Sequence, residues 1–170
     1  MKLKSTIMLP LLLVSTAYAV TVQEGRREID ASLYLDPNAQ FGHVLTLGLD
    51  YGKYVRDNLQ LLTGAEFRDT DRSSVYALSG IAEKGFDIDS SFYPFVRLGI
   101  GFTLVDTEFG NDTAAYLSFG GGTKYYFKKE VSMFAFYYLG LDLASEDVYA
   151  EEDDYSSTNF SFRAGLGYSF

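Results

Sequence analysis

The residues that could support catalysis are few in this sequence. His43 is its single histidine, and it contains no cysteine. The adjacent positions Val44 and Leu45 are not serine, and no G-x-S-x-G, H-E-x-x-H or P-loop pattern occurs. His43 shares the parity of Leu45 and Leu47 in an alternating stretch, so we expect it to be an interfacial polar side chain that points outward. We therefore expect no catalytic site, no cofactor and no metal.

An acidic stretch from Ser145 to Ser157 is a second candidate for chemistry. Its six acidic residues are Glu146, Asp147, Glu151, Glu152, Asp153 and Asp154. Hard cations bind several carboxylate oxygens at once, but the stretch lacks the ligand spacing and the turn glycine of an EF-hand loop. We expect a solvated charge run, with a weak cation interaction as the functional alternative.

A third set of candidates consists of charged side chains that alternate with apolar ones. These residues share a face with many glycines, and they are Glu28, Asp30, Asp50, Glu66, Arg68, Arg97, Lys124, Asp142 and Arg163. A period of two is typical of β-strands, in which successive side chains point to opposite faces. Strands must therefore position this set.

Eight strands are predicted from this alternation. They cover about 28–35, 41–51, 59–68, 75–84, 92–105, 115–127, 131–144 and 158–170. Turns or loops are expected at 36–38, 52–58, 69–74, 85–90, 106–113, 128–130 and 145–157, where turn-forming and polar residues gather. The two faces of the 75–84 strand are too alike in polarity for alternation to orient it. Even spacing predicts an all-β, eight-stranded antiparallel up-and-down barrel with both termini at one end.

The first nineteen residues have the pattern of a signal peptide. Lys2 and Lys4 precede the apolar run from Ile7 to Val14, and Ala17-Tyr18-Ala19 forms a cleavage site before Val20. We expect residues 1–19 to be removed on export and residues 20–170 to form one domain. The formal net charge of −9 argues against nucleic acid as a partner. No apolar run of about twenty residues follows, so any membrane crossing must be made by strands.

Alternation alone does not separate a membrane barrel from a soluble lipocalin-type barrel, so the two faces are compared by size. The apolar face carries four to six bulky residues per strand, too many for the interior of an eight-stranded barrel. The other face carries glycines among charges. We therefore expect the bulky face to contact lipid, with one aromatic girdle at Tyr51, Tyr125, Phe127, Tyr168 and Phe170 and another at Phe67, Phe102 and Phe160.

The AYA signal site, the GIGF and FGGGTKYYF strands and the final RAGLGYSF resemble small eight-stranded outer-membrane barrels of Gram-negative bacteria. These are the OmpA transmembrane domain, OmpX and the opacity-protein-like porin family. The resemblance covers the residues after the signal peptide. It implies location in the outer membrane, and it implies that Phe170, with Tyr168 on the same face, is the signal for the barrel-assembly machinery. Most loops here are short, a departure from the adhesins among these relatives.

We expect a monomer in contact with outer-membrane lipid and lipopolysaccharide, with a role in envelope integrity or surface interaction. The nine charged residues should pair inside the lumen, with Arg163 joining the set near the termini. Tyr34, Tyr126, Phe134, Phe136 and Tyr138 should fill the remaining space. One alternative is a narrow porin for small solutes. Another is a lipid A-modifying enzyme, since some eight-stranded barrels have that activity.

Overall fold

The computed structural model describes residues 22–39, 42–71, 73–88, 91–107, 110–127, 133–147, 149–150 and 155–170. Within these residues the structure is all β. None of the described segments forms a helix long and apolar enough to cross a membrane. The predicted signal peptide, residues 1–19, lies outside the described residues.

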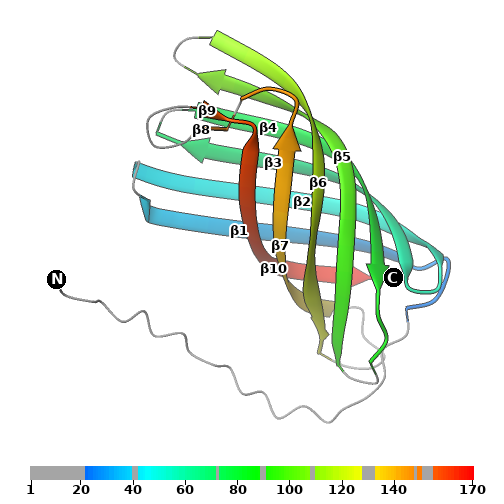
Figure 1. Ribbon diagram of the computed structural model, residues 1–170. Coiled ribbons are helices and arrows are strands. Elements are labelled where there is room, and N and C mark those ends of the chain that lie inside the picture. The colour runs from blue at the N-terminus through cyan, green and yellow to red at the C-terminus, as the bar shows by residue number, and fades with distance from the viewer. Residues whose placement is uncertain are drawn as a thin grey trace.

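Eight antiparallel strands of the described chain close into a barrel (Figure 1). They are β1 (Arg27–Ala39), β2 (Gly42–Arg56), β3 (Leu59–Thr70), β4 (Ser73–Gly85), β5 (Phe92–Thr107), β6 (Gly110–Tyr126), β7 (Met133–Ala144) and β10 (Thr158–Ser169). Each pairs with its neighbours in the chain, and β10 pairs with β1. The two-residue strands β8 (Tyr149–Ala150) and β9 (Tyr155–Ser156) form a separate small sheet. The predicted fold class is confirmed.

Several predicted connections are shorter than the sequence indicated or lie elsewhere in the chain. The 52–58 connection reduces to Asp57 and Asn58, because β2 continues to Arg56 and β3 begins at Leu59. Asn58 adopts a φ of 58°, a conformation that asparagine tolerates better than most residues. Residues 106–113 are also mostly in strands. The turn expected at 36–38 lies within β1, where the register with β2 shifts between Asp36 and Ala39.

The alternating faces point as the size comparison predicted. Leu98, Ile100 and Phe102 on β5 are exposed on the outer wall, whereas Arg97 and Thr103, which precede and follow them in the strand, are buried. Inward glycines leave room for bulky neighbours: a Cβ on Gly167 would overlap the ring of Phe134. The wall therefore has a bulky apolar outside and a glycine-rich, charged inside.

The structure also orients β4, which alternation left open. Its inward residues are Ser73, Val75, Ala77, Ser79, Ile81 and Glu83, and its outward face includes Leu78 and Lys84. The inward face is half apolar, which explains why its polarity did not mark it. Glu83 is 1% exposed, so β4 contributes a buried charge to the lumen.

The terminal end of the barrel, defined by Arg27 and Phe170, is capped by the segment that precedes β1. Val22 is 1% exposed and packs in a cluster with Tyr54, Tyr93, Tyr126, Phe134 and Phe136. Asn58 holds it: the Val22 N–H donates to Asn58 Oδ1 at 3.2 Å, and the Asn58 N–H donates to the Val22 carbonyl at 3.0 Å. No element was predicted between residue 20 and the first strand at about residue 28, and the structure shows part of this segment folded against the terminal end of the barrel.

The seam between β1 and β10 closes the barrel along part of its height. Its ladder runs from Glu28 opposite Ser169 to Leu33 opposite Ala164. Beyond these residues β10 continues beside β7 as far as Thr158, while β1 continues beside β2. Figure 1 shows β10 rising next to β7 while β1 runs away with β2. At the far end of the barrel, defined by Thr70 and Thr158, the two closing strands have separated.

Candidate functional site

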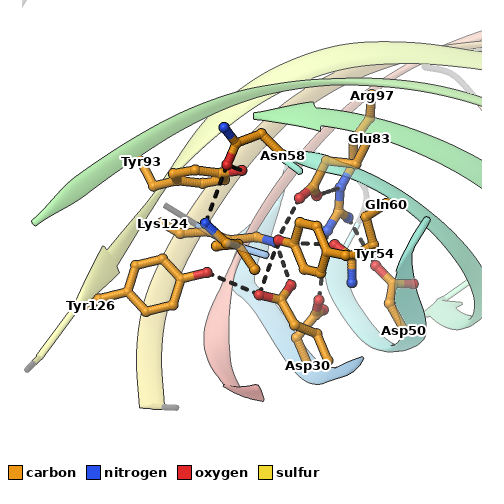
Figure 2. Close-up of polar contacts among 12 residues, drawn as sticks. Asp30, Asp50, Tyr54, Asn58, Gln60, Glu83, Tyr93, Arg97, Lys124 and Tyr126 are labelled. Atoms are coloured by element: carbon orange, nitrogen blue, oxygen red, sulfur yellow. Dashed lines mark hydrogen bonds and ion pairs between the residues drawn. The ribbon is translucent and has the colours of Figure 1, made fainter. Parts of the chain in front are cut away.

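Lys124 on β6 lies at the centre of the charged lumen. It is fully buried, and its Nζ donates to Glu28 Oε2 on β1 at 2.5 Å and to Glu83 Oε1 on β4 at 2.6 Å. Longer contacts of 3.4 Å reach the Tyr54 hydroxyl and Gln60 Oε1. The ammonium thus links β6 through the lumen to β1 and β4, neither of which is adjacent to β6 in the barrel (Figure 2).

Arg97 on β5 forms the second cationic centre beside Lys124. Its Nε donates to Glu83 Oε2 at 2.7 Å, its Nη1 donates to Asp50 Oδ2 at 2.8 Å, and its Nη2 lies 3.6 Å from Asp30 Oδ2. Asp30 and Asp50 are directly opposite each other on β1 and β2, an arrangement that repels when both carry charge. The guanidinium between them offsets this repulsion, and its planar fork reaches three carboxylates at once.

Carboxyl groups outnumber cations in this lower cluster, which we define as Glu28, Asp30, Asp50, Glu83, Arg97 and Lys124. Neutral donors supply part of the difference, because the hydroxyls of Tyr54 and Tyr126 donate to Glu28 Oε1 at 3.1 and 2.9 Å. Such hydrogen bonding is required, since a buried charge without partners is strongly destabilising. Figure 2 shows Glu83 linking Arg97 with Lys124.

A second group of charges, the upper cluster, lies toward the far end and comprises Glu66, Arg68, Asp142, Asn159 and Arg163. Glu66 pairs with both guanidinium groups: Oε1 lies 3.3 Å from Arg68 Nη2, and Oε2 contacts Arg163 Nη2. Arg68 Nη1 also donates to Asn159 Oδ1 at 2.9 Å, and Asn159 Nδ2 donates to Asp142 Oδ2 at 3.1 Å. The side-chain amide of Asn159 therefore connects Arg68 with Asp142 through two hydrogen bonds.

The structure places all nine predicted lumen residues inside the barrel, with one regrouping. Arg163 was expected with the charges near the termini, but its ion pair is to Glu66 in the upper cluster. The reason is its height on β10: Arg163 lies opposite Tyr138 on β7, whereas Gly167 and Ser169 occupy the terminal end. The prediction for Arg163 was wrong in this respect.

Sequence reasoning missed Glu83 of the lower cluster and two residues that contact this cluster, Tyr54 and Gln60. Glu83 was left out because alternation did not orient β4. Tyr54 lay in the predicted connection 52–58, and Gln60 carries no charge. A usable signal was present in Glu83-Lys84, since one of two adjacent charges in a strand must face inward. The register supports this choice, because Glu83 lies opposite Arg97.

Aromatic rings fill the terminal half of the lumen around these charges. Phe134 and Phe95 place their centroids 5.1 and 5.5 Å from Lys124 Nζ, and Phe95 and Tyr138 lie 5.0 and 5.4 Å from the Arg97 guanidinium. With the Val22 cluster below, this half is packed with side chains. The far half contains a cavity of about 290 Å³ bordered by Arg68, Arg163 and the seam.

The lumen charges have no evident metal-binding arrangement. Across the part of the chain that the structure describes, no three His, Cys, Asp or Glu side chains are grouped so as to hold a metal ion. The carboxylates of the lower cluster are instead separated by Arg97 and Lys124. The side chain of His43 lies outside the described residues, as do residues 148 and 151–154 of the acidic stretch, which include four of its six acidic residues.

The last strand carries the predicted assembly signal on the outer wall. Tyr168 and Phe170 are both exposed, and their rings stack with centroids 6.0 Å apart. The backbone N–H and carbonyl of Phe170 each bond to Arg27 at 2.8 Å. Phe170 thus completes the ladder that closes the barrel.

Comparisons with known proteins support the fold. No protein-family profile matches the sequence, and no curated protein matches it. Among solved structures, the N-terminal β-barrel domain of Pseudomonas aeruginosa OprF matches with a TM-score of 0.60 and 18% identity, over 87% of this chain and 98% of that one. Neisserial surface protein A matches with a TM-score of 0.57 and 13% identity, over 89% and 96% of the two chains. The chain therefore has the fold of small eight-stranded outer-membrane barrels.

Proposed function

We propose that this chain is an outer-membrane protein with a structural role in envelope integrity or surface interaction. The observation that carries the proposal is the outer wall. Leu98, Ile100, Phe102 and Phe160 are between 57% and 82% exposed, and they belong to a continuous apolar surface around the barrel. Soluble monomers rarely expose apolar patches of more than a few hundred Å², whereas a lipid-facing wall requires them.

Aromatic side chains at the terminal end support the same setting. Phe92 packs on Tyr125 with centroids 5.1 Å apart, and Tyr125 packs on Phe127 at 5.7 Å. Together with Tyr168 and Phe170 they form a band near one rim, where the ring edges of an interfacial girdle would lie. In this proposal the terminal end faces the periplasm and the far end faces outward.

The packed lumen argues against a wide pore. Lys124 and Arg97 are held by carboxylates from several strands, and Val22 closes the terminal end beneath them. We therefore place the protein among barrels without a large conducting path and without an enzymatic activity or cofactor. Its partners are outer-membrane lipid, lipopolysaccharide and the barrel-assembly machinery, and it acts as a monomer after export by its signal peptide.

The experiment that tests this proposal combines fractionation with conductance. The protein should appear in the outer-membrane fraction and migrate as a heat-modifiable band, because a folded barrel resists detergent until heated. In planar bilayers the refolded protein should give no large, stable, ohmic channels. Such channels would instead support the porin alternative.

A parallel measurement addresses the enzyme alternative. Mass spectra of lipid A from cells with and without the protein should be identical. A gain or loss of an acyl chain that depends on the protein would contradict the structural role.

A further inference from the structure

The far half of the seam forms a pocket that opens from the lumen toward the outer wall. The cavity of about 290 Å³ is lined by inward residues such as Thr46, Arg68 and Arg163, and also by Phe160 and Phe162. Phe160 and Phe162 belong to the outer face of β10 and are 82% and 46% exposed. The cavity thus borders five successive residues of β10, Asn159 to Arg163, along the edge where the β1–β10 ladder has ended.

An aromatic contact marks the lower edge of this opening. Tyr34 on β1 meets Phe162 on β10 edge to face, with centroids 6.3 Å apart. This pair stands just beyond Leu33 and Ala164, the last residues of the ladder. Side-chain contact therefore replaces backbone hydrogen bonding at the point where the closing strands separate, and ring contacts of this kind are worth only about 0.5–1.5 kcal/mol beyond their buried area.

The inner end of the pocket is cationic. Arg68 and Arg163 are the charged residues among its described lining, and they share a single carboxylate, Glu66. Asp142 is linked to Arg68 through the side-chain amide of Asn159. One donor of the Arg163 guanidinium is unused, because the Nε is buried without a hydrogen-bond partner.

Ser161 supplies a second unused polar group on the same strand. It is 8% exposed, lines the pocket, and its Oγ is also without a partner. Among the described residues nine buried side-chain polar atoms have no hydrogen-bond partner, and these two belong to the residues that line the pocket. Both would be satisfied by an oxyanion that accepts from the guanidinium and the hydroxyl.

We propose that this seam pocket binds an anionic alkyl amphiphile from the membrane. Its phosphate or carboxylate head group lies inside the lumen against Arg163, Arg68 and Ser161. Its alkyl chain leaves between β1 and β10 past Phe162 and Phe160 into the lipid phase. The cavity has roughly the volume of ten water molecules in the liquid, which suits a head group and the first part of a chain, with the remainder outside.

The placement of the alkyl chain rests on the proposed membrane setting, whereas the head-group site rests only on the lumen. A test should therefore be made on protein already shown to be a folded, heat-modifiable barrel in dodecyl maltoside micelles. If the protein does not fold there, the proposed function fails. If it folds and does not bind, only the seam pocket fails.

The binding test uses NMR of the arginine Nε–H groups in protein labelled with ¹⁵N-arginine. Three probes are titrated separately: dodecyl phosphate, inorganic phosphate and dodecanol. We expect dodecyl phosphate to shift the Arg163 Nε–H signal saturably, while the other two probes need at least about tenfold higher concentration because each lacks one half of the interaction. Equal saturation by inorganic phosphate or by dodecanol would overturn the proposal, as would no saturable shift with dodecyl phosphate.

Matched variants separate the head group from the chain. Arg163→Lys keeps the charge beside Glu66 but loses the planar fork, so dodecyl phosphate should bind more weakly while the barrel stays folded. Because this variant lacks the Arg163 Nε–H group, its binding is followed by the Nε–H signal of Arg68, which also lines the pocket. Phe160→Ala should also weaken it, whereas Phe102→Ala removes an equally lipid-facing ring far along the wall and should leave binding unchanged. If Arg163→Lys fails to fold, the two phenylalanine variants still decide: equal effects of both would contradict a path through the seam.

Discussion

Replacing Lys124 by methionine tests whether the lower cluster stabilises the barrel. Methionine retains the length of the chain but removes the ammonium that contacts Glu28 and Glu83 at 2.5 and 2.6 Å. Neither carboxylate is left entirely alone, because Tyr54 and Tyr126 still donate to Glu28, and Arg97 still donates to Glu83. Breaking a buried ion pair on one side destabilises by about 3–5 kcal/mol, and we expect Lys124→Met to fall in this range.

That loss is large against the roughly 5–15 kcal/mol that holds a typical domain folded. Urea unfolding in micelles, followed by heat-modifiable migration and the near-ultraviolet circular dichroism of tyrosine, measures it. Lys84→Met is the matched control: Lys84 lies next to Glu83 but is exposed on the outer face, and surface substitutions usually stay within about 0.5 kcal/mol.

A double variant separates the ion pair from packing. Adding Glu28→Gln to Lys124→Met removes the carboxylate charge that has lost its ammonium partner. The double variant should therefore lose about 0.5–3 kcal/mol less stability than the sum of the losses of the two single variants. Equal stability losses for Lys124→Met and Lys84→Met would refute the reasoning, as would strict additivity with Glu28→Gln.

Three further predictions concern assembly, topology and the upper cluster. Deleting Phe170 removes two backbone hydrogen bonds to Arg27 and the terminal aromatic, and should lower the amount of heat-modifiable barrel in membranes; an undiminished band would count against this. Protease added to intact cells should cut within 145–157 and spare 128–129, and the reverse pattern would invert the proposed orientation. Arg163→Ala removes one of the two guanidinium partners of Glu66 and should lower the free energy of unfolding by about 3–5 kcal/mol, a change that urea titration detects; a wild-type midpoint would show that Arg68 alone suffices for Glu66.

The strands were predictable because each two-faced stretch repeats with a period of two over ten or more residues. β10 shows this best, with Phe160, Phe162 and Leu166 facing out and Ser161 and Gly167 facing in. Strand ends were less predictable. Gly52 and Lys53 look like turn residues, yet they continue β2, because Gly52 lies opposite Glu28 and next to the side chain of Gln60.

The membership of the charge clusters was only partly predictable, because it depends on register and height. Alternation places Arg163 on the inner face but does not say which acid it meets across the lumen. Glu83 required the facing of β4, which its inward Val75 and Ile81 concealed. The opening of the seam had no sequence signal, since it follows from where β1 turns away with β2.

The lower cluster also bears on how the barrel folds. Lys124 bonds to Glu28, 96 residues earlier in the chain, and to Glu83, 41 residues earlier. Contacts between such distant segments form late, because closing long loops is entropically unfavourable. In an open sheet, or in a barrel with one strand more or one strand fewer, these charged side chains would lack their ion-pair partners. The cluster therefore favours the eight-stranded ring, in which Lys124 of β6 meets Glu28 of β1 inside the lumen.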